Sequence, residues 1–552
     1  MKLEEFKPHL LILIASICLW LSYPPFSFNF LLPIGIFSFL WLIYSSLSGK
    51  LKFFLGFAGG SLYFFLFMKW WWALYPLDWA GVDNKFIGAI VVMLIWVASA
   101  VSGGIFWGFW VLMADFLISE KQKTLKFRNI LFVSSLIGST FILAEYARSW
   151  FFSLVWLGKG TYWGGNWTWG NLAYDFSNNF IVNYQVSLGG IYLVEFIIIF
   201  LIALCFFCIR AQNKIRKVGL LGIFVLSVIF YLPNFIKLSE VRPSPAEVGP
   251  LSVRPPVEIA IIQTKMPSDI NLSSQARIDE FKLELSLLHE AAKLNPTPQI
   301  IVFPEGANFI SNLSSILDKD QLSNFLVNLF KERTLLVDNN VVFENGVRKS
   351  KVLFVDTKEG LIGSYDKQFL TPGGEFMPYW FELLFKIFAK DKLSGFIAQR
   401  SFENGSLAPP VVDLRQGDGV KTGAVVCSGL FSPGLLRELS SKEPDFIIAL
   451  TSTGIFKGAN DLIDQNVAIA QIRAIENRKS IILSANFGKS SIIDYQGRVI
   501  KSTKNQEPQL FTGSVVPYSV KTLYNKFGDW LVILAFIYIF FVYQSRSKGL
   551  IK

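Results

Sequence analysis

Long apolar runs occupy both ends of the chain, and a polar stretch of globular composition lies between them. The runs are long enough to cross a bilayer and cover about residues 9–23, 30–47, 53–72, 86–116, 130–157, 188–209, 218–236 and 530–544. We therefore predict an α-helical membrane domain with seven transmembrane helices over residues 1–238. An eighth helix and its tail are predicted over residues 517–552.

The polar stretch, residues 257–516, is long enough for one substantial core. Its strand-like runs are Val257–Gln263, Gln299–Phe303, Lys351–Asp356, Thr422–Cys427, Phe446–Leu450, Ser480–Ser484 and Ser491–Asp494. Helical periodicity separates several of them, notably over Ala276–Leu294 and Asp464–Asn477. This alternation predicts a layered α/β domain. The segment 239–256 holds five prolines and is predicted to be a linker.

Basic residues gather in short connections between the apolar runs, and such connections normally face the cytoplasm. An eight-helix topology places five clusters on that side: Lys2 and Lys7; Lys50 and Lys52; Lys121, Lys123, Lys126 and Arg128; Arg210, Lys214, Arg216 and Lys217; Arg546, Lys548 and Lys552. The polar domain is therefore predicted to lie outside the cytoplasm. The net charge of +11 is explained by these clusters, so a nucleic-acid partner is not expected.

Scarce histidine and cysteine limit the chemistry that the polar domain can perform. The chain has only two histidines, His9 at the start of an apolar run and His289 in a predicted helix, where we expect an ordinary surface residue. A Cys-His or Ser-His site would have to use His289. A histidine-rich metal site is excluded, and no metal or cofactor is expected. Of the four cysteines, only Cys427 lies in the polar domain, so no disulfide framework is predicted.

Three strand-like runs end in chemically active side chains. Cys427 ends the buried run Gly423–Cys427, Glu305 follows Ile300–Pro304, and Lys367 follows Tyr365. A thiol, a carboxylate and an amine brought together predict acyl transfer through a thioester, with Cys427 as nucleophile and Glu305 as general base.

The other predicted groups support this chemistry. Lys367 would keep the Glu305 carboxylate ionised and stabilise the oxyanion of the tetrahedral intermediate. The backbone N–H of Ser428, just after the nucleophile, would supply a second donor to that oxyanion. Glu375, eight residues after Lys367, would orient the lysine or assist proton transfer.

Several features of the apolar region call for specific packing. Arg148 is expected to pair with Glu145 or Glu195, because charges at membrane depth are usually paired. Gly56 and Gly60 match Gly104 and Gly108 as a close helix contact. Trp70–Trp72 and Trp79 are predicted to be interfacial anchors, and the Trp-rich segment 158–187 forms either a lip for lipid entry or further anchors. The segment 376–396 is either a membrane-dipping arm or a core helix.

The three strand ends resemble the Glu-Lys-Cys triad of the nitrilase, or carbon–nitrogen hydrolase, superfamily. The resemblance rests on Phe303-Pro-Glu305, Tyr365-Asp-Lys367, Gly374-Glu375-Phe376-Met-Pro378 and Val426-Cys427. Together with the apolar runs on both sides, the chain is similar to the apolipoprotein N-acyltransferase family. Further similar stretches are Gly189–Glu195, Ala260–Gln263, Leu450–Ser452, Arg473–Glu476 and Ala485-Asn486.

This resemblance implies an αββα sandwich and a ping-pong reaction in a bacterial inner membrane, with the catalytic domain on the periplasmic side. Cys427 would take an acyl chain from a phospholipid, and the α-amine of a diacylglyceryl-cysteine at a lipoprotein N-terminus would then accept it. The chain departs from the family at two places. Many members follow the cysteine with Tyr and Glu, where this chain has Ser428 and Gly429, and Leu272 stands near a family tryptophan.

Two alternatives remain open from the sequence. A membrane-tethered amidase or thioesterase of the same superfamily would use the same triad and pass the acyl group to water. A catalytically inactive relative that binds lipid or lipoprotein is suggested by Ser428 and Gly429 beside the nucleophile.

Overall fold

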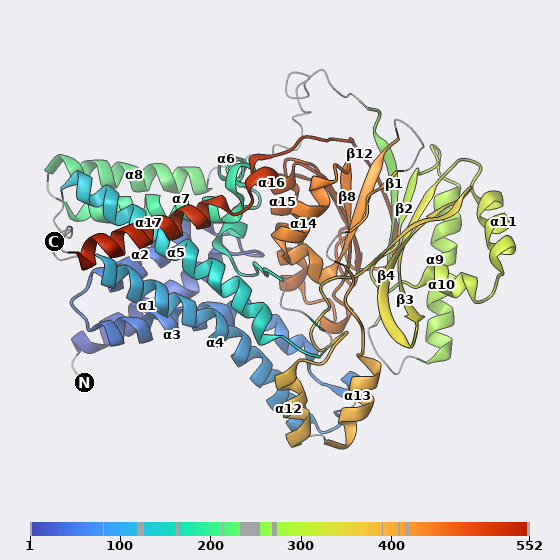
Figure 1. Ribbon diagram of the computed structural model, residues 1–552, viewed down its shortest axis with the longest axis horizontal. Helices are drawn as coiled ribbons and strands as arrows, with labels where there is room; N and C mark the ends of the chain where they lie inside the picture. The colour runs from blue at the N-terminus through green and yellow to red at the C-terminus, as the bar shows by residue number, and fades with distance from the viewer. Residues whose placement is uncertain are drawn as a thin grey trace.

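The computed structural model describes residues 3–80, 82–118, 126–159, 161, 165–211, 213–231, 254–267, 273–388, 390–406, 409–413 and 419–548. Figure 1 shows a bundle of long helices beside a sandwich of two sheets flanked by helices. The last helix of the chain returns from the sandwich into the bundle. Most of the predicted linker, and Leu272, lie outside the described residues.

Each of the eight apolar runs forms a helix. They are α1 (Leu3–Ser22), α2 (Leu32–Tyr44), α3 (Gly49–Phe67), α4 (Lys85–Leu117), α5 (Phe127–Val155), α7 (Val186–Arg210), α8 (Asn213–Tyr231) and α17 (Trp530–Ser547). Within the described ranges, five of these are long and apolar enough to cross a membrane, namely α3, α4, α5, α7 and α17. The apolar stretches of α1 and α2 are shorter. The positions of the helices are confirmed, whereas the count of eight membrane spans is not.

The glycines of α3 and α4 allow these two helices to touch at their backbones, as predicted. A Cβ atom placed on Gly60 would lie 3.0 Å from the Cα of Gly104, and one on Gly56 would lie 3.2 Å from the Cα of Gly108. Larger side chains at these positions would force the helices apart, so the small residues set the distance between them.

A buried ion pair links the bundle to the segment that follows α5. Arg148 Nη2 lies 2.7 Å from Glu145 Oε2, and both side chains are buried. The same nitrogen donates to Asn171 Oδ1, and Asn171 Nδ2 donates to Glu195 Oε2 at 3.1 Å. The predicted pairing of Arg148 with a glutamate is therefore confirmed, and it ties the segment around Trp169 to the bundle because Arg148 Nη1 donates to the Trp169 carbonyl.

The polar domain is an αββα sandwich of two six-stranded sheets, which confirms the predicted fold class. In spatial order the first sheet contains β12 (Gln509–Val515), β1 (Val257–Gln263), β2 (Ile300–Val302), β3 (Leu335–Glu344), β4 (Val347–Asp356) and β5 (Gly360–Asp366). The second contains β11 (Val499–Ser502), β10 (Ser491–Ile493), β9 (Ser480–Asn486), β8 (Phe446–Ser452), β7 (Lys421–Val426) and β6 (Val412–Asp413). Strands β1, β2 and β3 run parallel, as do β7, β8 and β9.

Helices cover the outer faces of both sheets (Figure 1). The first sheet packs under α9 (Ser274–Ala292), α10 (Phe309–Ser314) and α11 (Lys319–Leu329), and Leu288 and Phe309 lie in that core. The second sheet packs under α14 (Pro433–Ser441) and α15 (Asn460–Asn477), which lie between it and the helical bundle. His289 lies half-buried on α9 against Phe325, and it lines neither of the two cavities described below.

One continuous apolar core runs from the bundle into the α14–α15 layer of the sandwich. Polar contacts strengthen this junction: Arg473 of α15, which is fully buried, donates from Nη2 to Thr168 Oγ1 and from Nε to the Leu430 carbonyl. Arg473 also pairs with Glu476. Leu430 belongs to the short helix η7 (Cys427–Phe431), so the junction holds the turn that begins at Cys427 against the bundle.

Candidate active site

The three predicted catalytic residues come from both sheets of the sandwich. Glu305 follows β2 and Lys367 follows β5 in the first sheet, whereas Cys427 follows β7 in the second. Residues after β2 and β7 lie at the carboxyl ends of parallel strands, the edge at which α/β proteins commonly place their sites. The sandwich therefore brings these distant segments to one place.

Lys367 lies at the centre of the polar group. Its Nζ is 2.7 Å from Glu305 Oε1 and 2.7 Å from Glu375 Oε2, and its side chain is only 1% exposed. Thr371 connects the lysine to the thiol, since Thr371 Oγ1 accepts from Lys367 Nζ at 3.2 Å and lies 4.0 Å from Cys427 Sγ. Glu305 also lies close enough to the Cys427 thiol for each group to shift the pKa of the other. The structure thus brings Glu305, Lys367, Glu375 and Cys427 together.

Glu375 fixes the loop as well as the lysine. Its Oε2 accepts a hydrogen bond of 2.7 Å from the Thr371 backbone N–H and pairs with Lys367. The loop hydroxyl of Thr371 is thereby held beside the thiol. Sequence reasoning missed Thr371, although it opens the Thr371–Glu375 segment that contains the predicted Glu375.

Burial and charge set the protonation states of the site. Burial raises the pKa of Cys427 to about 12, and the neighbouring Glu305 adds to this while Lys367 opposes it. Burial also raises the pKa of Glu305, against the opposing effect of Lys367. Burial by itself would lower the pKa of Lys367, but Glu305 and Glu375 outweigh it and the pKa is raised. At neutral pH the site therefore rests with a neutral thiol beside an ammonium group.

Cys427 adopts a strained backbone conformation. Its φ is +45°, in the left-handed region that residues with a Cβ seldom occupy. Cys427 is also the first residue of the turn η7, and the amides at the start of such a turn have no acceptor within it. The Ser428 N–H, predicted as an oxyanion donor, lies at this position.

The Ser428 side chain ties η7 to the loop that follows Lys367 (residues 368–375), here called the lysine loop. Its hydroxyl donates to the carbonyl of Phe369, two residues after Lys367, and Ser428 is buried. The space at Gly429 is also restricted, because a Cβ there would lie 3.0 Å from Leu435 Cδ2. The two residues that depart from the family pattern therefore pack closely in this structure.

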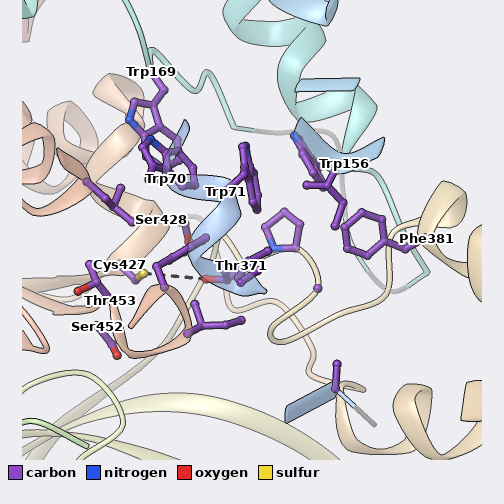
Figure 2. Close-up of a pocket in the computed structure, with 18 of the residues that line it drawn as sticks. Trp70, Trp71, Trp156, Trp169, Thr371, Phe381, Cys427, Ser428, Ser452 and Thr453 are labelled. Atoms are coloured by element: carbon purple, nitrogen blue, oxygen red, sulfur yellow. Dashed lines mark hydrogen bonds between the residues drawn. The ribbon is translucent and has the colours of Figure 1, made fainter. Parts of the chain in front are cut away.

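Tryptophans wall an apolar cavity on the bundle side of Cys427 (Figure 2). Trp70 stacks on Trp169 with ring centroids 4.7 Å apart, and Trp71 stacks on Trp156 at 5.4 Å. Phe381 of the sandwich closes the wall against Trp156 at 5.5 Å. This cavity joins the helical bundle to the thiol.

The prediction that Trp70 and Trp71 are interfacial anchors is wrong. They are 3% and 8% exposed, and only Trp72, at 37%, points outward. The reason is local geometry: η2 (Lys69–Leu74) is a tight helix with three residues per turn, so consecutive side chains point in different directions. Trp167 and Trp169 of the segment 158–187 are buried in the same wall, whereas Trp163 lies outside the described residues.

A larger polar cavity of about 620 Å³ lies on the other side of the thiol. Its walls include Glu305, Glu375 and Cys427, together with Asn308 and Arg400. Cys427 and Thr371 belong to the walls of both cavities. The thiol can therefore be reached by an apolar group from one side and a polar group from the other.

The segment 376–396 forms α12 (Tyr379–Phe388) and leads into α13 (Leu393–Gln399), and both helices project from the sandwich beside the bundle (Figure 1). One face of α12 is buried, with Phe381 and Phe385 lining the apolar cavity. The opposite face exposes Tyr379, Leu383 and Ile387. The segment is therefore not a simple core helix, because it carries an exposed apolar ridge.

Comparison with known proteins agrees with both halves of the structure. A family model of the apolipoprotein N-acyltransferase N-terminal domain matches residues 15–205, and a carbon–nitrogen hydrolase model matches residues 259–523. The chain belongs to the apolipoprotein N-acyltransferase family. Of the family, the apolipoprotein N-acyltransferase of Rickettsia prowazekii is 20% identical over 454 residues, which are 79% of this chain and 81% of that protein.

A second member of the apolipoprotein N-acyltransferase family, from Aquifex aeolicus, is 26% identical over 324 residues, 58% of this chain and 65% of that protein. Among solved structures, a carbon–nitrogen hydrolase from Helicobacter pylori aligns with a TM-score of 0.35 and 14% identity, covering 47% of this chain and 89% of that one. Membership of the family agrees with a sandwich domain fused to apolar helices.

Proposed function

We propose that this chain moves an acyl chain from a phospholipid, through a thioester on Cys427, to the α-amine of a lipoprotein N-terminal diacylglyceryl-cysteine. The observation that carries the proposal is the position of the thiol. Cys427 lies between a tryptophan-lined cavity beside the membrane helices and a polar cavity that holds Glu305 and Lys367. Family membership supplies the class of acyl acceptor.

The first half-reaction acylates the cysteine. Glu305 takes the thiol proton while sulfur attacks the ester carbonyl, and a C–S bond forms. The oxyanion receives hydrogen bonds from Lys367 Nζ and the Ser428 N–H, each positioned donor being worth about 10²–10³ in rate. The ester C–O bond then breaks, and the proton on Glu305 passes to the leaving oxygen, which releases a lysophospholipid.

The second half-reaction restores the thiol. The neutral α-amine attacks the thioester carbonyl and gives one proton to Glu305, so that a C–N bond forms. The C–S bond then breaks, and the proton on Glu305 returns to the sulfur. The product is an amide, and Glu305 ends as the carboxylate beside Lys367.

The helical bundle has a physical role in this reaction. Removing an acyl chain from lipid costs about 0.8 kcal/mol per methylene, or about 12 kcal/mol for some fifteen of them. A thiol that remained in solvent would have to meet this cost, whereas a cavity continuous with the membrane helices receives the chain from an apolar medium. The aromatic wall of Trp70, Trp71, Trp156 and Trp169 provides apolar surroundings for the acyl chain next to Cys427.

The proposed setting is a bacterial inner membrane with the sandwich on its periplasmic side. The domains would be 1–238 and 517–552 in the membrane, 239–256 as linker and 257–516 as catalytic domain. The basic connections support this orientation, as does the arrangement in which α1 begins and α17 ends at the end of the bundle remote from the sandwich (Figure 1).

The experiment that tests the function supplies the purified protein with phospholipid and a diacylglyceryl peptide. Mass spectrometry should show the peptide gaining one acyl group as an amide, together with one lysophospholipid. Release of free fatty acid without acylated peptide would instead assign the chain to the hydrolases. If neither acylated peptide nor free fatty acid is formed, the chain binds lipid without catalysing a reaction.

A further inference from the structure

Arg400 is a buried cation in the wall of the polar cavity that holds Cys427. Its side chain is only 4% exposed. The guanidinium carbon lies 3.5 Å from the centre of the Phe396 ring and 5.6 Å from that of Trp79. Nε donates to the Gly373 carbonyl at 2.8 Å. Aromatic rings and one backbone bond therefore hold the group in place.

No carboxylate balances this charge within the part of the chain that the structure describes. Arg400 forms no salt bridge there, and its Nη1 has no hydrogen-bond partner. Two other buried arginines among the described residues differ, since Arg148 pairs with Glu145 and Arg473 with Glu476. Burial lowers the pKa of Arg400 to about 10, so the group remains charged at neutral pH. A buried cation without a counter-ion favours binding of an anion from outside the chain.

The neighbours of Arg400 identify the kind of anion. The guanidinium shares its cavity with Cys427, and the Phe402 N–H donates to the Glu375 carbonyl, so the Arg400 segment runs beside the lysine loop. Guanidinium groups bind phosphate with paired N–H donors. A phospholipid carries one phosphate, joined through glycerol to the ester that reacts with the thiol.

We propose that Arg400 binds the phosphate of the phospholipid acyl donor and so holds its ester at Cys427. This assignment rests on the proposed function and adds the group that recognises the headgroup. With the phosphate at Arg400, the ester lies between the two cavities and the acyl chain enters the tryptophan wall. The acyl donor is then selected by the charge of its phosphate as well as by its acyl chain.

The test compares two acyl donors with identical chains, phosphatidylglycerol and diacylglycerol, in the same micelles. The acylation rate of Cys427 is followed by intact mass for the wild type, Arg400→Gln, Arg400→Lys and the control Arg333→Gln. Arg333 is a surface residue paired with Asp356 and Glu359 and lines neither cavity. The ratio of the two rates within one preparation does not depend on how much protein is folded.

In Arg400→Gln we expect the phosphatidylglycerol rate to fall about 10- to 100-fold and the diacylglycerol rate to change less than about twofold. Arg400→Lys should recover part of the loss, and Arg333→Gln should match the wild type. An equal fall with both donors, or no fall, would overturn the assignment.

Two further outcomes separate the remaining explanations. Inorganic phosphate that stimulates the diacylglycerol reaction in the wild type but not in Arg400→Gln would assign the site to the free ion and overturn the lipid assignment. Failure of the wild type with both donors would overturn the proposed function, and this assignment with it.

Discussion

Lys367 Nζ lies 2.7 Å from Glu305 Oε1, and this contact joins the segment after β5 to the segment after β2 beside Cys427. Because Glu375 holds the same ammonium group from the loop that follows Lys367, one buried cation is shared by two carboxylates. The arrangement keeps Glu305 able to accept a proton while the thiol is neutral.

Replacing Glu305, the proposed base, should remove most of the chemistry. In Glu305→Gln the carbonyl oxygen still accepts from Lys367, but it cannot take the thiol proton. We expect the rate of Cys427 acylation to fall by about 10²–10⁴, measured by intact mass over time. Thermal unfolding should show that the variant is folded, and a rate within tenfold of the wild type would exclude Glu305 as the base.

The pH dependence of Cys427 acylation should follow the protonation of Glu305. The carboxylate must be deprotonated to accept the thiol proton, and burial raises its pKa above the ordinary 4.5. Activity is therefore present above the raised pKa and is lost as the pH falls through it. A profile of kcat/KM against pH in Triton micelles should show this acidic limb above pH 4.5, whereas a limb at or below 4.5 would contradict the buried environment.

The Cys427 thiol should resist alkylation at neutral pH. Its pKa is raised by burial to about 12, against 9.0 for an ordinary cysteine. Iodoacetamide reacts with the thiolate, so the rate of modification should still be rising at pH 10. Glutathione in the same buffer provides the control and should level off near its own pKa. A plateau for Cys427 close to pH 9 would show that the thiol is not buried as described.

We expect the hydroxyl group of Thr371 to contribute to the rate of Cys427 acylation. The Oγ1 atom accepts from Lys367 and lies beside Cys427 Sγ, so Thr371→Val leaves one donor of the lysine unmatched. Loss of such a bond to a charged group costs about 1.5–3 kcal/mol, which corresponds to about a 10- to 150-fold slower acylation. Thr371→Ser keeps the hydroxyl and should stay within about threefold. Equal effects of the two changes would argue against a role for the oxygen.

We expect the tryptophan wall to determine how well donors with long acyl chains bind. Trp71→Ala removes the partner of Trp156 beside Cys427, so long-chain donors should show a higher KM while a short-chain ester changes little. Trp72→Ala is the matched control because Trp72 lies next in sequence, is 37% exposed and does not line the cavity. A Trp71→Ala protein that treats long and short donors alike would show that the wall does not hold the chain.

The apolar runs predicted the positions of the bundle helices well, because each run is as long as a helix and carries few charges. The strand ends likewise predicted the grouping around Lys367, because parallel strands deliver their carboxyl ends to one edge. Strand β3 was missed since its centre, Asp338–Asn340, is polar, and in the structure these side chains cap the α10 segment from buried positions. A buried polar side chain whose hydrogen-bond partner lies elsewhere in the chain cannot be recognised from the alternation of apolar and polar residues.

The aromatic wall could not be predicted for a different reason. Trp70 and Trp169 are 99 positions apart, and they meet because Trp169, in the segment after α5, stacks on both Trp70 of η2 and Phe431 of η7. Arg400 was missed because its burial depends on Trp79, which is distant in sequence, as well as on the nearby Phe396. The clustering of tryptophans in two short segments is the available signal, but such clusters are also typical of membrane-interface anchors.

The thioester is the central claim, and intact-mass analysis after incubation with phospholipid tests it most directly. We predict one added acyl mass on the wild type, removed by neutral hydroxylamine and located on Cys427 by peptide mapping, with no addition to Cys427→Ala. An unchanged mass for the wild type, or the same hydroxylamine-sensitive mass on Cys427→Ala, would contradict the account.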